Sequence, residues 1–166
     1  MTVAWSLSKT PKSLTLDDKA QDTASKGTTL SGVNLKASKT YTLKATDARN
    51  AVATRTADVA FRDKRHWWVA VSLDAVGVTD QIINQATGEL AAGYSKTFTL
   101  NAAAGQHIYY AFPASWGTPR FFVGGFEGGF ALLKTFDHKN ASGATISYSV
   151  WKSTNAGLGN TTVEVK

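Results

Sequence analysis

Cysteine is absent from this 166-residue sequence, and the residue types that most often carry chemistry are scarce. Without thiols the chain has no disulfide framework, no cysteine nucleophile and no cysteine ligand for zinc, so its stability must come from burial alone. No apolar run approaches the roughly 18 residues that a membrane helix requires. The first residues lack the basic and then apolar pattern of a secretory signal. We therefore expect no membrane partner, and synthesis of the chain in a bacterial cytoplasm.

Histidines and glutamates are too few and too scattered to predict a catalytic or metal site. His66, His107 and His138 lie far apart in the sequence, and none has a second ligand at the spacing that zinc sites use. Asp137 precedes His138, but no Gly-x-Ser-x-Gly motif supplies a nucleophile to complete a hydrolase triad. We therefore expect no enzymatic activity, no metal and no cofactor.

A glycine-rich segment, residues 123–130, lacks the Gly-Lys-Ser/Thr ending of a phosphate-binding loop. We expect two short strands joined by a tight turn, with Phe126 and Phe130 packed beneath it. Glu127 then lies at the tip of this turn. There its carboxylate can accept hydrogen bonds from backbone amides, pair with a basic residue of a neighbouring subunit, or be solvated.

Alternation of apolar and polar residues, the pattern of a half-buried strand, recurs along the whole chain. In the first half it runs through residues 3–7, 14–16, 41–45 and 53–61, and in the second half through 97–100, 106–112, 120–123, 130–136, 145–151 and 161–165. The segments Thr46–Ala51 and Asn140–Gly143 have the composition of hairpin turns. The sequence predicts an all-β fold.

A charge cluster, residues 62–65, separates two alternating regions and marks a domain junction. We expect two small β-sandwich modules, residues 1–64 and 65–166. The second begins with an apolar strand at His66, and it contains one short helix that Thr79 caps and Gly88 stops.

The first half resembles fibronectin type III and bacterial immunoglobulin-like domains in two segments, residues 29–35 (Thr-Leu-Ser-Gly-Val-Asn-Leu) and 39–47 (Lys-Thr-Tyr-Thr-Leu-Lys-Ala-Thr-Asp). The resemblance implies a sandwich in which Tyr41 is a corner residue. The expected core comprises Trp5, Leu7, Leu30, Tyr41 and Leu43. Only a few residues precede Trp5, where such domains have a further strand, so either this edge is bare or a partner supplies a strand.

The second half resembles structural proteins of tailed bacteriophages and prophages. The resemblance is carried by residues 108–113 (Ile-Tyr-Tyr-Ala-Phe-Pro), 116–119, 122–130 and 140–143, by Asn155, and by residues 158–163. In that family the segment follows an immunoglobulin-like module, the order found here. The resemblance implies a virion component of tail, fibre or baseplate type, and it brings no catalytic residues.

Aromatic side chains are the main candidates for contacts with partners: Trp67 and Trp68, Tyr109 and Tyr110, and Trp116. Adjacent residues on a strand point to opposite faces, so one ring of each pair should lie in the core and the other should face a domain interface or a partner. Flat aromatic faces also stack on sugars, so a glycan surface at Trp68, Tyr110 or Trp116 remains an alternative.

Basic residues give a net charge of +6, but most are scattered, and we expect no nucleic-acid partner. The exception is the patch formed by Arg62, Lys64 and Arg65 around Asp63. This patch is a candidate contact for an acidic neighbouring subunit or a cell-surface polymer.

The sequence as a whole predicts a non-enzymatic virion structural protein, a tail, baseplate or fibre component that assembles in multiple copies or as a homo-oligomer with other virion proteins. Two alternatives stay open. One is a decoration protein of the capsid head, and the other is a carbohydrate-binding module for attachment to the host.

Overall fold

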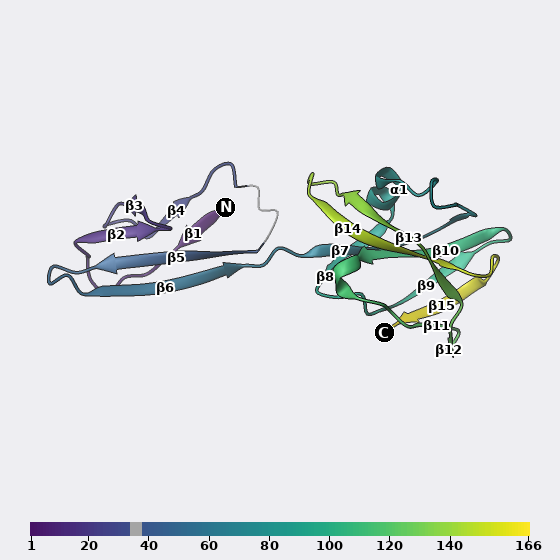
Figure 1. Ribbon diagram of the computed structural model, residues 1–166. Coiled ribbons are helices and arrows are strands. Elements are labelled where there is room, and N and C mark those ends of the chain that lie inside the picture. The colour runs from purple at the N-terminus through teal and green to yellow at the C-terminus, as the bar shows by residue number, and fades with distance from the viewer. Residues whose placement is uncertain (34–37) are drawn as a thin grey trace. The chain divides into compact units, whose positions relative to one another are not determined.

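The computed structural model describes residues 1–33 and 38–166, and its fold is all-β, as predicted. Asn34 and Leu35, which end the first of the two immunoglobulin-like segments, lie outside the described residues. The chain divides into two compact units, Met1–Phe61 and Arg62–Lys166, and each is described by itself below (Figure 1). No helix in the described ranges is long and apolar enough to cross a membrane.

The described residues of the first unit form six strands in two antiparallel sheets of unequal size. The smaller sheet pairs β1 with β4, and the larger has the order β3-β2-β5-β6. The strands are β1 (Thr2–Ala4), β2 (Ser13–Leu16), β3 (Lys19–Gln21), β4 (Gly27–Thr29), β5 (Lys39–Thr46) and β6 (Val52–Val59). The strand predicted over residues 3–7 is shorter than expected, although Trp5 still donates its backbone N–H to the Lys26 carbonyl.

Aspartates and an asparagine shape the hairpins of the first unit. Asp17 and Asp18 adopt positive φ angles of 47° and 61° between β2 and β3, a conformation that short polar residues tolerate. Between β5 and β6 the Asp47 carboxylate accepts the backbone N–H groups of Arg49 and Ala51, and Asn50 has a φ of 63°. The hairpin turn predicted at residues 46–51 is therefore confirmed.

Few side chains of the first unit are fully buried. Leu14, Leu16 and Tyr41 form its buried core. Of the core predicted from sequence, only Tyr41 is buried, while Trp5, Leu7, Leu30 and Leu43 are half-buried. The prediction failed for these four because the small sheet covers only part of the large one.

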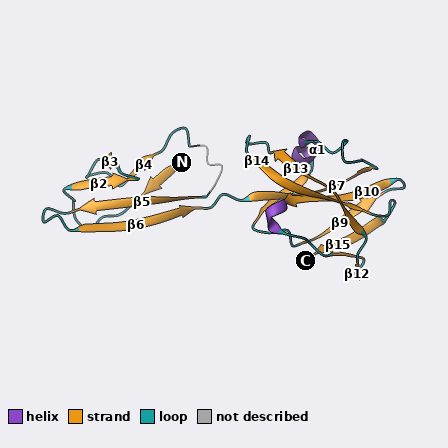
Figure 2. Cartoon of the chain, viewed as in Figure 1, coloured by secondary structure: helices purple, strands orange, loops and turns teal. Residues whose placement is uncertain are grey.

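The second unit contains a five-stranded sheet with the order β13-β14-β10-β7-β8 and a four-stranded sheet with the order β12-β11-β15-β9 (Figure 2). One helix and one 3₁₀ turn accompany them. The elements are β7 (Asp63–Val71), α1 (Asp80–Gln85), β8 (Thr87–Ala91), β9 (Lys96–Ala102), β10 (Gln106–Pro113), the 3₁₀ turn (Ala114–Trp116), β11 (Phe121–Val123), β12 (Phe126–Glu127), β13 (Phe130–Lys139), β14 (Thr145–Ser153) and β15 (Gly159–Val165).

Both faces of the five-stranded sheet are covered. Between the two sheets, Ile108, Tyr110 and Phe112 of β10 pack against apolar residues of β9, β11 and β15. On the opposite face, Tyr109 and neighbouring residues of β14 pack against Ile83 of α1 and the preceding loop. The central strand β10 is buried on both sides, which explains its unbroken apolar sequence.

Several sequence predictions for the second unit need correction at their boundaries. Strand β7 begins at Asp63, so the charge cluster does not interrupt the strand and the predicted junction between residues 64 and 65 falls inside it. The predicted helix is confirmed, with Thr79 as its cap, but it ends at Gln85 because β8 begins two residues later. Strand β8 was not predicted, since Gly88 interrupts its sequence.

Candidate interaction surface

The aromatic pairs proposed as partner contacts lie on the neighbouring strands β7 and β10. Trp68 is opposite Tyr109 and Trp67 is opposite Tyr110. Both tyrosines have zero exposure, and the two tryptophans are half-buried. The prediction that one ring of each pair faces outward is therefore wrong for the tyrosines, because the helix and its loop cover the face that was expected to be free.

Ring stacking and hydroxyl bonds hold these aromatics inside the unit. Trp68 stacks on Tyr109 with ring centroids 5.1 Å apart, and Trp116 stacks on Phe112 at 6.2 Å. The Tyr110 hydroxyl donates to the Tyr94 carbonyl at 2.6 Å, and burial raises the pKa of this phenol. These residues consequently do not offer the open, flat faces that sugar stacking requires.

The predicted basic patch is split between the interior and the surface. The Arg65 guanidinium pairs with the Glu89 carboxylate of β8 and donates to the carbonyls of Gly93 and Ser95. Lys96 lies 2.8 Å from the same carboxylate, and these two cations lower the pKa of Glu89. Arg65 therefore fastens the β8–β9 loop to β7, whereas Arg62 and Lys64 are exposed.

Glu127 lies at an exposed turn and pairs within its own chain. Its two carboxylate oxygens accept hydrogen bonds of 2.8 and 2.7 Å from Arg120, and this pair lowers the pKa of Glu127. The expectation that Phe126 packs beneath the turn is wrong, because this ring is 82% exposed. Phe130 does pack inward, with its ring 4.2 Å from that of Phe121.

A cluster around the buried histidines is a structural element of the second unit. His138 has zero exposure, and its Nδ1 lies 2.9 Å from Asp80 Oδ1 at the start of α1. The His66 ring is 6.4 Å from that of His138. In the described ranges no group of three or more histidine, aspartate or glutamate residues is arranged to hold a metal ion. The Asp80 carboxylate, which also accepts the Lys139 backbone N–H at 3.0 Å, attaches the helix to β13.

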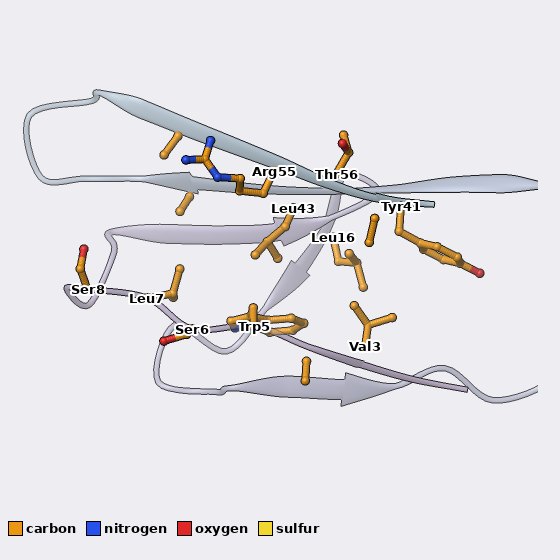
Figure 3. A pocket seen from close by; sticks show the side chains of 14 residues that line it. Val3, Trp5, Ser6, Leu7, Ser8, Leu16, Tyr41, Leu43, Arg55 and Thr56 are labelled. Atoms are coloured by element: carbon orange, nitrogen blue, oxygen red, sulfur yellow. The ribbon is translucent and has the colours of Figure 1, made fainter. Parts of the chain in front are cut away.

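The first unit contains an apolar groove of about 440 Å³ between its two sheets, here called the β1–β6 groove (Figure 3). Side chains from β1 and the segment after it form one wall, and side chains from the large sheet face them across the groove. Its main apolar lining residues are Val3, Trp5, Leu7, Leu16, Leu43 and Ala45. The Trp5 indole is anchored at one end by a 2.8 Å hydrogen bond to the Ser25 carbonyl.

Strand β6 forms the uncovered side of this groove. Ala53, Arg55 and Ala57 line it, and every residue of β6 except Val59 is exposed. The Arg55 guanidinium donates to the carbonyl of its neighbour Thr54, and it forms no ion pair with any described residue. A positive charge therefore lies among small apolar side chains.

Two strand edges border the β1–β6 groove. Within the described ranges, β1 pairs only with β4 and β6 pairs only with β5. Strand β6 pairs along its full length without a bulge and contains no proline, so among the usual features that protect an edge it has only the charged side chains of Arg55 and Asp58. Sequence reasoning did not locate the groove.

No protein-family model, no curated protein and no solved structure matches this chain. The resemblance to immunoglobulin-like domains and to phage structural proteins thus depends on the sequence segments quoted above.

Proposed function

We propose that this chain is a non-enzymatic structural protein of a bacteriophage particle, a tail, baseplate or fibre component that acts through contacts with neighbouring subunits. The observation that supports a role in assembly is the incomplete first unit, with an apolar groove and two strand edges left open. Exposed apolar surface beside unpaired backbone is a feature of chains that complete their fold by association. The assignment to a phage rests on the sequence segments in the second unit.

A carbohydrate-binding role receives less support from the geometry. The rings expected to stack on sugars, those of Trp68, Tyr110 and Trp116, are packed against Tyr109, Phe98 and Phe112. A capsid decoration protein would use the same open edges as a tail protein. The head and tail hypotheses are therefore distinguished by where the protein lies on the particle.

The proposal is tested by gold labelling of intact particles with an antibody raised against the full chain. Label at the tail or baseplate is the expected result, and label over the shell would move the protein to the head. Particles without label, together with binding of the purified chain to a glycan array, would overturn the structural role in favour of host attachment.

A further inference from the structure

We infer that the β1–β6 groove receives an extended, acidic segment of a different protein, which adds as a third strand to the free edge of β1 and covers β6. This inference rests on the proposed function, because it names the kind of partner that completes the first unit. The segment is identified by its chemistry: alternating apolar residues for the groove and a carboxylate for Arg55.

Backbone geometry shows which groups of β1 are available to such a strand. Met1 accepts from the Leu30 N–H, and Trp5 donates to the Lys26 carbonyl, so the odd-numbered residues bond toward β4. Peptide groups alternate in direction along a strand, and those of Thr2, Ala4 and Ser6 therefore point to the opposite edge. An incoming strand finds these donors and acceptors already aligned.

The size difference between the two sheets indicates where this strand lies. The small sheet has two strands and the large sheet has four, so the small sheet cannot cover the whole inner face. A strand added to β1 lies about 4.8 Å further across the small sheet, and facing sheets pack about 10 Å apart. That position is above the exposed side chains of β6. The apolar residues of the new strand then meet Ala53 and Ala57.

Charge favours a partner that differs from this chain. Residues 1–61 contain nine lysines and arginines against five aspartates and no glutamate, so a second copy would bring like charge to the groove. Arg55, among alanines, lacks a carboxylate partner among the described residues. A glutamate or aspartate on the inward face of the new strand supplies one, and partial desolvation in the groove strengthens this pairing.

The experiment is a titration of the full ¹⁵N-labelled chain with a synthetic peptide of about seven residues. Valine and threonine alternate in this peptide, and one central glutamate takes a position on the valine face. We expect shifts and slowed amide exchange at Thr2, Ala4 and Ser6, with resonances of the second unit unchanged. A peptide of the same composition in which the alternation is broken should bind at least about tenfold more weakly, because its apolar residues no longer share one face.

Charge reversal provides the matched test of Arg55. R55E should weaken binding of the glutamate peptide about tenfold or more and should prefer a lysine peptide instead. R49E, the same change in the exposed β5–β6 turn, should bind like the parent chain. A4P removes one N–H from the free edge of β1 and should abolish binding, and its unperturbed spectrum elsewhere would show that it folds.

Three results would overturn the inference. These are saturating peptide with no change at β1, equal affinities for R55E and R49E, or shifts at β6 that grow with protein concentration in the absence of peptide. The last result would identify a second copy as the occupant. If the peptide binds and particles carry no label, the inference stands and the phage assignment is removed. If particles are labelled and the peptide does not bind, the phage assignment stands and the inference is removed.

Discussion

The two units of this chain differ in how completely their sheets are covered. In the described residues of the first unit only three apolar side chains are buried, against fifteen in the second. The central sheet of the second unit has a second sheet on one face and a helix with its loop on the other. The large sheet of the first unit faces a sheet half its size. The second unit is therefore expected to be stable without a partner, and the first to be marginal.

This difference follows from the side chains that each unit places inward. Strand β10 carries large residues on both faces, whereas β6 offers Ala53, Arg55 and Ala57 to the groove. Small side chains do not reach across a sandwich that is about 10 Å thick. The face of β6 is thus suited to contact with an added strand and is poorly suited to closing the unit alone.

Truncation of Tyr110 should have the largest effect on stability. Its ring has no exposure, stacks on Phe98 and bonds to the Tyr94 carbonyl. Tyr110→Ala should lower the free energy of unfolding of the second unit by about 4 kcal/mol, because it leaves a large cavity. Urea titration followed through resonances of that unit measures the loss. Phe126→Ala, at an 82% exposed ring, is the control and should change stability very little.

Acid should destabilise the second unit through His66. Burial, together with the nearby His138, lowers the pKa of His66 from 6.5 to about 4. Between these values the unfolded chain binds a proton that the folded chain does not, so stability is complete above pH 6.5 and falls as the pH drops toward 4. From about pH 7 to about pH 4.5 the loss should reach about 2 to 3 kcal/mol.

The pH effect has a clear control. His66→Phe removes the titrating ring and should flatten the pH dependence, although it also removes the hydrogen bond between this ring and the Ala86 backbone. His107→Phe should leave the pH dependence of stability in place. Asp63 acts in the opposite direction, since burial raises its pKa above 3.8 and its protonation in acid therefore favours the folded chain. If the free energy of unfolding of His66→Phe changes with pH as steeply as that of the parent chain, the acid effect belongs to other groups.

Truncation of Trp5 should cost less than truncation of Tyr110, although tryptophan is the larger residue. Trp5 is half-buried beside an open groove, so its removal enlarges a space that water already reaches. Trp5→Ala should lower the free energy of unfolding of the first unit by about 1 to 2 kcal/mol, including its bond to Ser25. A loss as large as that of Tyr110→Ala would show that the two units are equally well packed.

Filling the groove should give the smallest change and one of opposite sign. Ala57→Val adds two methyl groups to an exposed β-strand position that faces the groove. We expect a gain of about 0.5 kcal/mol in the first unit, from added burial and the β preference of valine. The same variant should bind the acidic peptide more weakly. A destabilised Ala57→Val would mean that the groove is already closed in solution.

Local features of this fold were predictable from sequence because they depend on neighbouring residues. Alternation gave the strands around Leu14 and Leu16 and those of the second half, and Thr79 marked the start of the helix. Strand β8 was missed because its residues have little β preference and it is held in place by β7 and the Arg65–Glu89 pair, across 24 positions of sequence. The Arg120–Glu127 pair likewise required the β11–β12 pairing.

The sequence by itself determined that this protein is all-β, where its hairpins turn and that it has one short capped helix, since periodicity and turn chemistry are properties of a few adjacent residues. Only the tertiary structure decided what covers each face. Tyr148 reaches the Lys64 carbonyl across 84 positions, and α1 covers a face that alternation left open. Burial depends on which element packs against a strand, and the alternation of apolar and polar residues along the strand does not predict which element that is. The same reason hid the β1–β6 groove, which exists because the first unit has too few strands to cover its own sheet.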